Sequence, residues 1–201
     1  MADVDLILLL DTKNALNSTW VHQELNRAHD LGLGVVQLIW PNHHQTPGTE
    51  LSFPIFLKES DFESKCFDKN GRLESAIIHQ VVRSIESERI RSLSARRTRL
   101  VDGLQEYAGG NGASLYVHPA KNVDVLKSGQ KIAEIVPFVG VPDSFALYQQ
   151  ELQKAHDPTI IVYNGLGVDQ DWAKHLKWLN DKGTVRVHQI DDFGMFIGTI
   201  V

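Results

Sequence analysis

The first 40 residues alternate between apolar and polar segments in an order that predicts a strand, a helix and a second strand. Residues 6–10 form an aliphatic run, a polar turn follows, and a second apolar run extends from Val35 to Trp40. A nearly continuous apolar run is typical of a strand buried on both faces, and parallel strands need a crossover that is usually a helix. We expect that helix to begin at Ser18, a suitable N-cap, with Trp20 and Glu24 on one face.

The pattern continues with one short strand and one long helix. Residues 53–57 are the next expected strand. From Leu73 to Ile85, apolar residues recur three and four positions apart, as they do on the buried face of a helix. Beyond Ile85 this face thins among arginines. The remainder is therefore either an exposed connecting helix or a break between two helices.

Three glycines within residues 109–112 mark the expected domain boundary, which divides the chain into residues 1–108 and residues 109–201. The second segment again alternates strands and helices, as a small α/β unit does. The expected elements are a strand at 114–117, a hairpin of 123–126 and 131–136, a helix from Asp143 or Ser144, a strand at 159–163, a helix from Asp169 to a C-cap at Gly183, a strand at 185–190 and one more at 195–201.

Composition and charge exclude some classes of function. The 201 residues carry a net charge of −5, which argues against a nucleic-acid-binding surface because phosphate contacts need an excess of Lys and Arg. The single cysteine, Cys66, cannot form an internal disulfide, and the first apolar run is only about half a membrane span. We therefore expect a cytoplasmic protein without a membrane partner. The adjacent His43 and His44 diverge in direction and lack a third ligand at a suitable spacing, so we expect no metal site.

Ser18, Trp20 and Glu24 follow the first apolar run in the pattern S-x-W-x-x-x-E. This pattern resembles the TIR (Toll/interleukin-1 receptor-like) domain family, in which it lies on the helix after the third strand. The cysteine that often follows the Trp is Val21 here. The resemblance covers roughly the first 90 residues and only the second half of a TIR domain, since the family's opening strand, nucleotide-facing loop and first two helices would precede residue 1. It implies an α/β, flavodoxin-like parallel sheet that is partial, followed by a second small α/β unit.

The resemblance also implies a reaction. In enzymatic TIR domains the equivalent of Glu24 is required to cleave the bond between nicotinamide and ribose in NAD, so the chain resembles an NAD hydrolase that acts as a microbial defence or signalling effector. A carboxylate near the ribose stabilises the positive charge that develops there, and NAD is a substrate rather than a cofactor. The reading of the residues themselves places Asp11 at the carboxyl end of the first strand, Asn14 and Ser18 in the next loop, and Trp20 as an aromatic wall, as substrate-binding residues.

Several alternatives stay open from the sequence. Glu24 can instead be an exposed helical acid paired with Arg27 or Lys13, and Trp20 can fill the core. The C-terminal segment either completes the first sheet or forms an independent unit. The chain can be a non-catalytic interaction module that associates with TIR-like copies of itself or with a completing subunit. A third reading is a small-ligand sensor in the C-terminal unit, near residues 163–169.

Overall fold

The computed structural model of the protein describes residues 4–49, 51–65, 71–119, 122–152, 159–166, 168–182 and 185–200. These residues form an α/β protein that divides into two compact units, Val4–Ala95 and the part of the chain from Arg96 onward. The division falls inside one long helix, α2 (Ser75–Gly110), which contributes residues to both units.

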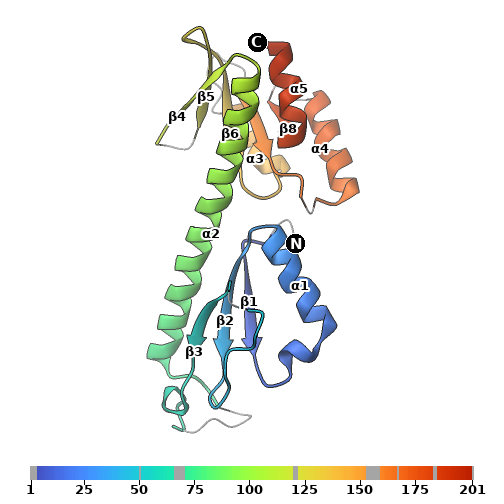
Figure 1. The fold of residues 1–201 in the computed structure, drawn as a ribbon. Helices are drawn as coiled ribbons and strands as arrows, with labels where there is room; N and C mark the ends of the chain where they lie inside the picture. Colours follow the sequence, from blue (N-terminus) through green and yellow to red (C-terminus); the bar gives the residue numbers. More distant parts are fainter. Residues whose placement is uncertain are drawn as a thin grey trace. The chain divides into compact units, whose positions relative to one another are not determined.

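The first unit contains a three-stranded parallel sheet in the order β1-β2-β3 (Figure 1). Its strands are β1 (Leu6–Asp11), β2 (Gly34–Ile39) and β3 (Phe53–Phe56), and the helix between the first two is α1 (Thr19–Asp30). Every residue of β2 is buried, as the continuous apolar run predicts for a central parallel strand. The strand-helix-strand prediction is confirmed, and the sheet is a partial flavodoxin-like arrangement.

The two helices of the first unit pack on opposite faces of β2. Leu25 and Ala28 of α1 contact Leu9 and Val35 in one apolar cluster. Val81 of α2 packs in another cluster together with Leu38, which lies three residues after Val35 on β2. Because side chains alternate between the faces of a strand, these two clusters lie on either side of the sheet.

Helix α2 resolves the alternative that the sequence left open beyond Ile85. It is one uninterrupted helix, not two, and it ends at Gly110 within the glycine-rich segment. Ser92 ties α2 to the start of β2. The Ser92 hydroxyl accepts a hydrogen bond from the backbone N–H of Gly34 at 2.9 Å and donates one to the carbonyl oxygen of Gly32 at 3.1 Å. The helix is therefore continuous, as one alternative expected, but it is not simply exposed, because Leu100, Val101, Leu104 and Ala108 are buried in an apolar cluster.

The second unit contains a five-stranded mixed sheet in the order β4-β5-β6-β7-β8 (Figure 1). The antiparallel part is β4 (Ser114–Val117), β5 (Val123–Lys127) and β6 (Gln130–Phe138), and β7 (Thr159–Tyr163) and β8 (Arg186–Gln189) continue it in parallel. The helices are α3 (Ser144–Leu152), α4 (Gln170–Lys182) and α5 (Ile190–Ile200). Strand β7 pairs with β6 and β8 rather than with β1, so the C-terminal segment forms its own sheet and does not complete the first one.

One predicted element of the second unit is wrong. The strand expected at 195–201 is helical over its described residues, because helix α5 covers Ile190–Ile200; Val201 lies outside the described residues. Phe193 and Ile197 are four positions apart and both fully buried, and Asp191 and Asp192 lie in the first turn, where carboxylates favour a helix. The apolar residues therefore follow helical spacing. The expected C-cap at Gly183 lies outside the described residues.

Candidate functional site

The Ser18–Glu24 segment forms the start of α1 and presents its functional candidates to solvent. Ser18 occupies the N-cap position, but its side chain makes no capping hydrogen bond. Trp20 is 68% exposed and does not fill the core. Glu24, one turn further on, is partly buried, and its carboxylate forms no ion pair or hydrogen bond with any residue that the structure describes, Lys13 and Arg27 included.

Asp11 lies at the carboxyl end of β1, but its carboxylate points into a closed polar network. It is fully buried and accepts the Gln37 amide at 2.6 Å, the Thr46 hydroxyl at 2.8 Å and the Thr46 backbone N–H at 3.1 Å. The Nε2 atom of His43 lies 3.2 Å from the same carboxylate. With both oxygens engaged by protein groups, Asp11 fixes the loop after β2 to the end of β1.

Gln37 extends this network across the first sheet. This fully buried side chain accepts the Gln45 amide at 2.9 Å and the Ser52 hydroxyl at 2.5 Å. The hydroxyl of Thr49 donates to the Thr46 carbonyl at 2.7 Å, which closes the loop on itself. Burial of so many polar groups is tolerated because each has a partner. The sequence reasoning missed the network, and its only signal is a glutamine inside an otherwise apolar strand.

Asn14 and Ser18 stay at the surface of the loop between β1 and α1. Asn14 accepts the Asn17 amide at 3.4 Å, across a short 3-10 turn at Ala15–Asn17. His43, considered above as a metal ligand, instead contacts Asp11. Among the residues that the structure describes, no group of three His, Cys, Asp or Glu side chains is arranged to hold a metal ion. Of the predicted site residues, Glu24 is thus the acid left available for chemistry.

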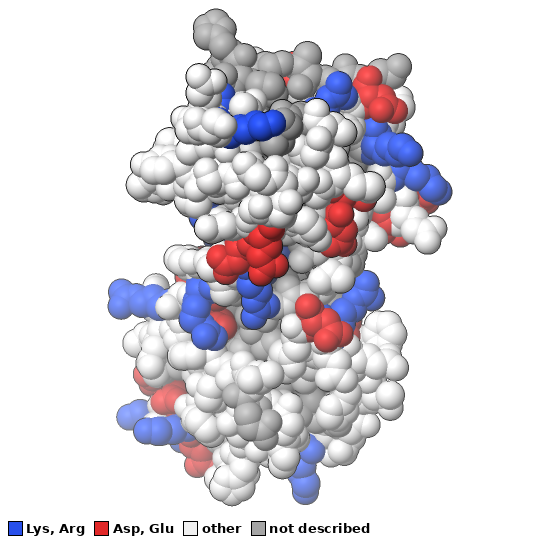
Figure 2. Space-filling view, turned by 45° about the horizontal axis from the view of Figure 1, so that its top comes forward, with Lys and Arg blue, Asp and Glu red and all other residues white. Residues whose placement is uncertain are grey.

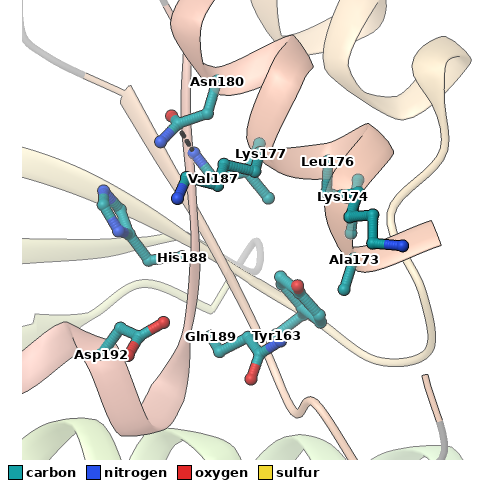
Figure 3. A pocket seen from close by; sticks show the side chains of 10 residues that line it. All are labelled: Tyr163, Ala173, Lys174, Leu176, Lys177, Asn180, Val187, His188, Gln189 and Asp192. Carbon is teal, nitrogen blue, oxygen red and sulfur yellow. Dashed lines mark hydrogen bonds between the residues drawn. The ribbon is translucent and has the colours of Figure 1, made fainter. Parts of the chain in front are cut away.

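The second unit has a cleft of about 420 Å³ beside its edge strand β8 (Figure 3). Helix α4 contributes one wall, with Lys174, Lys177 and Asn180, and the ends of β7 and β8 contribute Tyr163 and Gln189. Ligands of parallel α/β sheets usually bind at the carboxyl ends of the strands, where Tyr163 and Gln189 lie. The Asn180 side-chain oxygen, however, accepts the backbone N–H of Val187 at 3.0 Å, and so closes part of the β8 edge.

Two titratable side chains at this cleft have shifted pKa values. Burial raises the pKa of the Tyr163 hydroxyl, against the opposing effect of a hydrogen bond with Gln189. Burial lowers the pKa of His188, whose ring stacks on Phe196 with centroids 4.2 Å apart. Both shifts favour the neutral form, as desolvation does in an apolar environment.

A second polar cluster, around a cavity of about 300 Å³, lies on the antiparallel part of the same sheet. Asp124 accepts His118 at 2.7 Å and Lys131 at 2.9 Å, and Lys131 also contacts Glu134 at 3.0 Å. Burial raises the pKa of Asp124, but its bonds to Lys131 and His118 outweigh that effect and leave the pKa below its ordinary value. These contacts link neighbouring strands of the sheet, which is a structural role.

Two further surface properties concern the distribution of charge and of apolar residues. On the face shown in Figure 2, acidic and basic side chains are interspersed, and neither sign forms a continuous field. In the part of the chain that the structure describes, no helix combines the length and the apolar character needed to cross a membrane.

The chain was compared with protein-family models, curated proteins and solved structures. No family model, no curated protein and no solved structure matches the chain.

Proposed function

We propose that the protein functions by association through the outer edge of strand β1 in the first unit. Strand β1 is the outer strand of its sheet and, among the residues that the structure describes, pairs only with β2. Leu8 and Leu10 point to one face of this strand and are 44% and 50% exposed. Residues 6–10 contain no charge, proline or glycine, the features that usually protect an edge strand from pairing with another chain.

Helix α2 continues this apolar surface. Arg89 of α2 bonds Asp5, just before β1, at 3.0 Å, so the flank of the helix that carries Arg89 lies toward β1. Ile78 and Val82 occupy the same flank, eleven and seven positions earlier, and are 46% and 50% exposed. Leu8, Leu10, Ile78 and Val82 together form what we call the β1 surface.

We propose that the protein is a TIR-like association module whose β1 surface pairs with a second copy of the chain. An uncovered apolar face of this kind marks an interaction site in soluble proteins. A second copy fits because residues 6–10 are uncharged, so a symmetric strand pair meets no like-charge repulsion, and the nearby Asp5–Arg89 pair is already neutralised. The observation that carries the proposal is the exposure of Leu8 and Leu10 on an unpaired strand.

Leu8→Glu tests the association. A charge at the centre of the strand must be desolvated on pairing, so we expect the association constant to fall at least about tenfold. Sedimentation velocity over a range of concentrations measures it. Leu51→Glu is the matched control, since Leu51 is exposed in the loop before β3 and outside the β1 surface. Equal association by the Leu8→Glu variant and the parent would refute the proposal.

Cleavage of NAD is the second candidate function, and Glu24 is the observation that favours it. Its partly buried carboxylate has no protein partner in the described part of the chain, and the exposed Trp20 lies one turn before it. A carboxylate in this state can stabilise the positive charge that develops on a ribose as nicotinamide leaves. The substrate pocket then requires the associated form, in a cytoplasmic defence or signalling effector.

An NAD-consumption assay on the associated protein tests this candidate. We expect Glu24→Gln to lose turnover while the association constant stays unchanged. Asp30→Asn, at the exposed end of the same helix, controls for the loss of a negative charge on α1. Turnover that survives Glu24→Gln would rule out Glu24 as the catalytic carboxylate without affecting the association proposal.

A further inference from the structure

The outer edge of β1 presents a defined set of backbone groups. The Asp11 carbonyl accepts the N–H of Trp40, the residue after β2, at 3.3 Å, so the backbone of Asp11 points toward β2. Because the backbone groups of successive residues alternate between the two edges of a strand, the odd-numbered residues of β1 all point toward β2. The residues whose backbone points away from β2 are Leu6, Leu8 and Leu10.

Most of these outward groups lack a hydrogen-bond partner. The Leu10 carbonyl accepts the Thr12 N–H at 3.2 Å. The three N–H groups and the carbonyls of Leu6 and Leu8 bond to no residue that the structure describes. Backbone groups of this kind are satisfied either by water or by another strand. The edge therefore has the donors and acceptors that a partner strand needs, in alternation along the chain.

The apolar face of β1 determines the direction in which a partner strand runs. Leu10 lies beside Leu38 in the sheet, and Leu38 packs with Val81 of α2, so Leu8 and Leu10 are on the α2 side. A two-fold axis perpendicular to the sheet makes the paired strands antiparallel and keeps the α2 sides of both copies together. An axis along the strands would instead place the α2 side of one copy beside the α1 side of the other. Only the antiparallel pair joins the two β1 surfaces into one apolar face.

The length of β1 determines the register of this pair. Outward-pointing residues must lie opposite one another, because they exchange the hydrogen bonds of an antiparallel ladder. A pair centred on Leu8 places every residue of the apolar run, 6–10, opposite another residue of the same run. Moving the centre by one residue places Leu10 opposite Val4, or Leu6 opposite Thr12, and neither Val4 nor Thr12 belongs to the strand.

We infer that β1 pairs antiparallel with β1 of the second copy, centred on Leu8, and joins the two three-stranded sheets into one sheet of six strands. The inference rests on the proposed function and specifies its geometry. Each Leu8 exchanges two backbone hydrogen bonds with Leu8 of the other copy, and each Leu10 N–H donates to a Leu6 carbonyl. Beyond the ends, Asp5 faces Asp11, but Arg89 neutralises Asp5 at 3.0 Å and Asp11 is fully buried in its own network.

Cysteine cross-linking of the full chain tests the register. Cys66 is the only cysteine, so in a Cys66→Ser background only an introduced cysteine can link two copies. The two Leu8 Cα atoms of the inferred pair are about 5.5 Å apart, within reach of a disulfide, so Leu8→Cys should form a covalent dimer on oxidation. Leu10→Cys is the matched control. Leu10 is similarly exposed, but its two Cα atoms are separated by on the order of 14 Å and should not link.

A second variant keeps the test decisive if Leu8→Cys itself weakens association. Leu6 of one copy lies opposite Leu10 of the other, so the double variant Leu6→Cys/Leu10→Cys should form a covalent dimer. Neither of its single variants should do so. Within one chain the two cysteines are four residues apart along a strand, too far to link with each other.

Sedimentation velocity of the Cys66→Ser chain separates failure of this inference from failure of the proposed function. A chain that stays monomeric at every concentration refutes both. A chain whose association is lost in Leu8→Glu, but which forms no link in Leu8→Cys or in the double variant, overturns the inference and leaves the proposed function standing. A link in Leu10→Cys without one in Leu8→Cys shows that the strands pair in another register.

Discussion

Replacing Asp11 by alanine should destabilise the first unit strongly without affecting association or chemistry directly. The change removes the acceptor of four contacts, from Gln37, the Thr46 hydroxyl and backbone, and His43. Asp11 is the predicted site residue whose surroundings are most completely described. The substitution therefore tests whether its carboxylate holds the loop after β2, as its geometry indicates.

The loss in free energy of unfolding depends on which of the four donors can bond to water once the carboxylate is removed. Gln37 is fully buried, so its amide stays unsatisfied at a cost of about 1–3 kcal/mol. Thr46 and His43 lie partly exposed in a loop and can be solvated, which leaves the net loss of about 1 kcal/mol for each bond. We expect a total of about 4–6 kcal/mol. That is a large share of the roughly 5–14 kcal/mol expected for a unit of this size.

Hydrogen exchange of the β1 and β2 amides, measured in the native state, reports the stability of this unit separately from the second. Asn14→Ala is the control and should cost less than about 0.5 kcal/mol, because Asn14 lies exposed in the neighbouring loop. The double mutant Asp11→Ala/Thr46→Val should lose less than the sum of its single variants, since the two residues share bonds. A loss below about 1 kcal/mol, or strict additivity, would refute the structural role of Asp11.

Two further predictions concern stability. The second unit should lose stability in acid, because the folded-state pKa values of His188 and Asp124 are lowered and the unfolded chain therefore binds protons first as the pH falls. We expect the free energy of unfolding to fall below about pH 6.5 for His188 and below about pH 4 for Asp124. Urea unfolding at a series of pH values measures this, and a His188→Phe variant that keeps the step near pH 6.5 would contradict it. Ser92→Ala should cost about 1–3 kcal/mol in the first unit by leaving the buried Gly34 N–H without its acceptor, and hydrogen exchange at β2 that matches the wild type would disprove this.

Strands marked by a continuous apolar run could be located from the sequence, although β1, expected to be buried on both faces, exposes Leu8 and Leu10. The aliphatic run of β1, the buried β2 and the Thr159–Tyr163 strand all appear where the pattern places them. Helix α5 was misassigned because Phe193 and Ile197 fall just before and inside a short apolar tail, where a helix and a strand look alike over a few residues.

Contacts between distant segments could not be predicted in the same way. The sequence shows Asp11 at a strand end, but not that Thr46 and Gln37 surround it, because that depends on how the loop folds back. Trp20 illustrates the converse, since a tryptophan is usually buried and here is exposed. Periodicity reports which face of an element is apolar, and it does not report whether another element covers that face.

The most direct test of the central claim is the concentration dependence of amide hydrogen exchange in the full chain, which reports association through the β1 surface. Amide hydrogen exchange of residues 6–10 should slow as concentration rises, because the unpaired N–H groups of β1 gain partners only in the associated form. Leu8→Glu should abolish that dependence. Exchange that is the same at every concentration would show that the edge of β1 does not pair with a second copy.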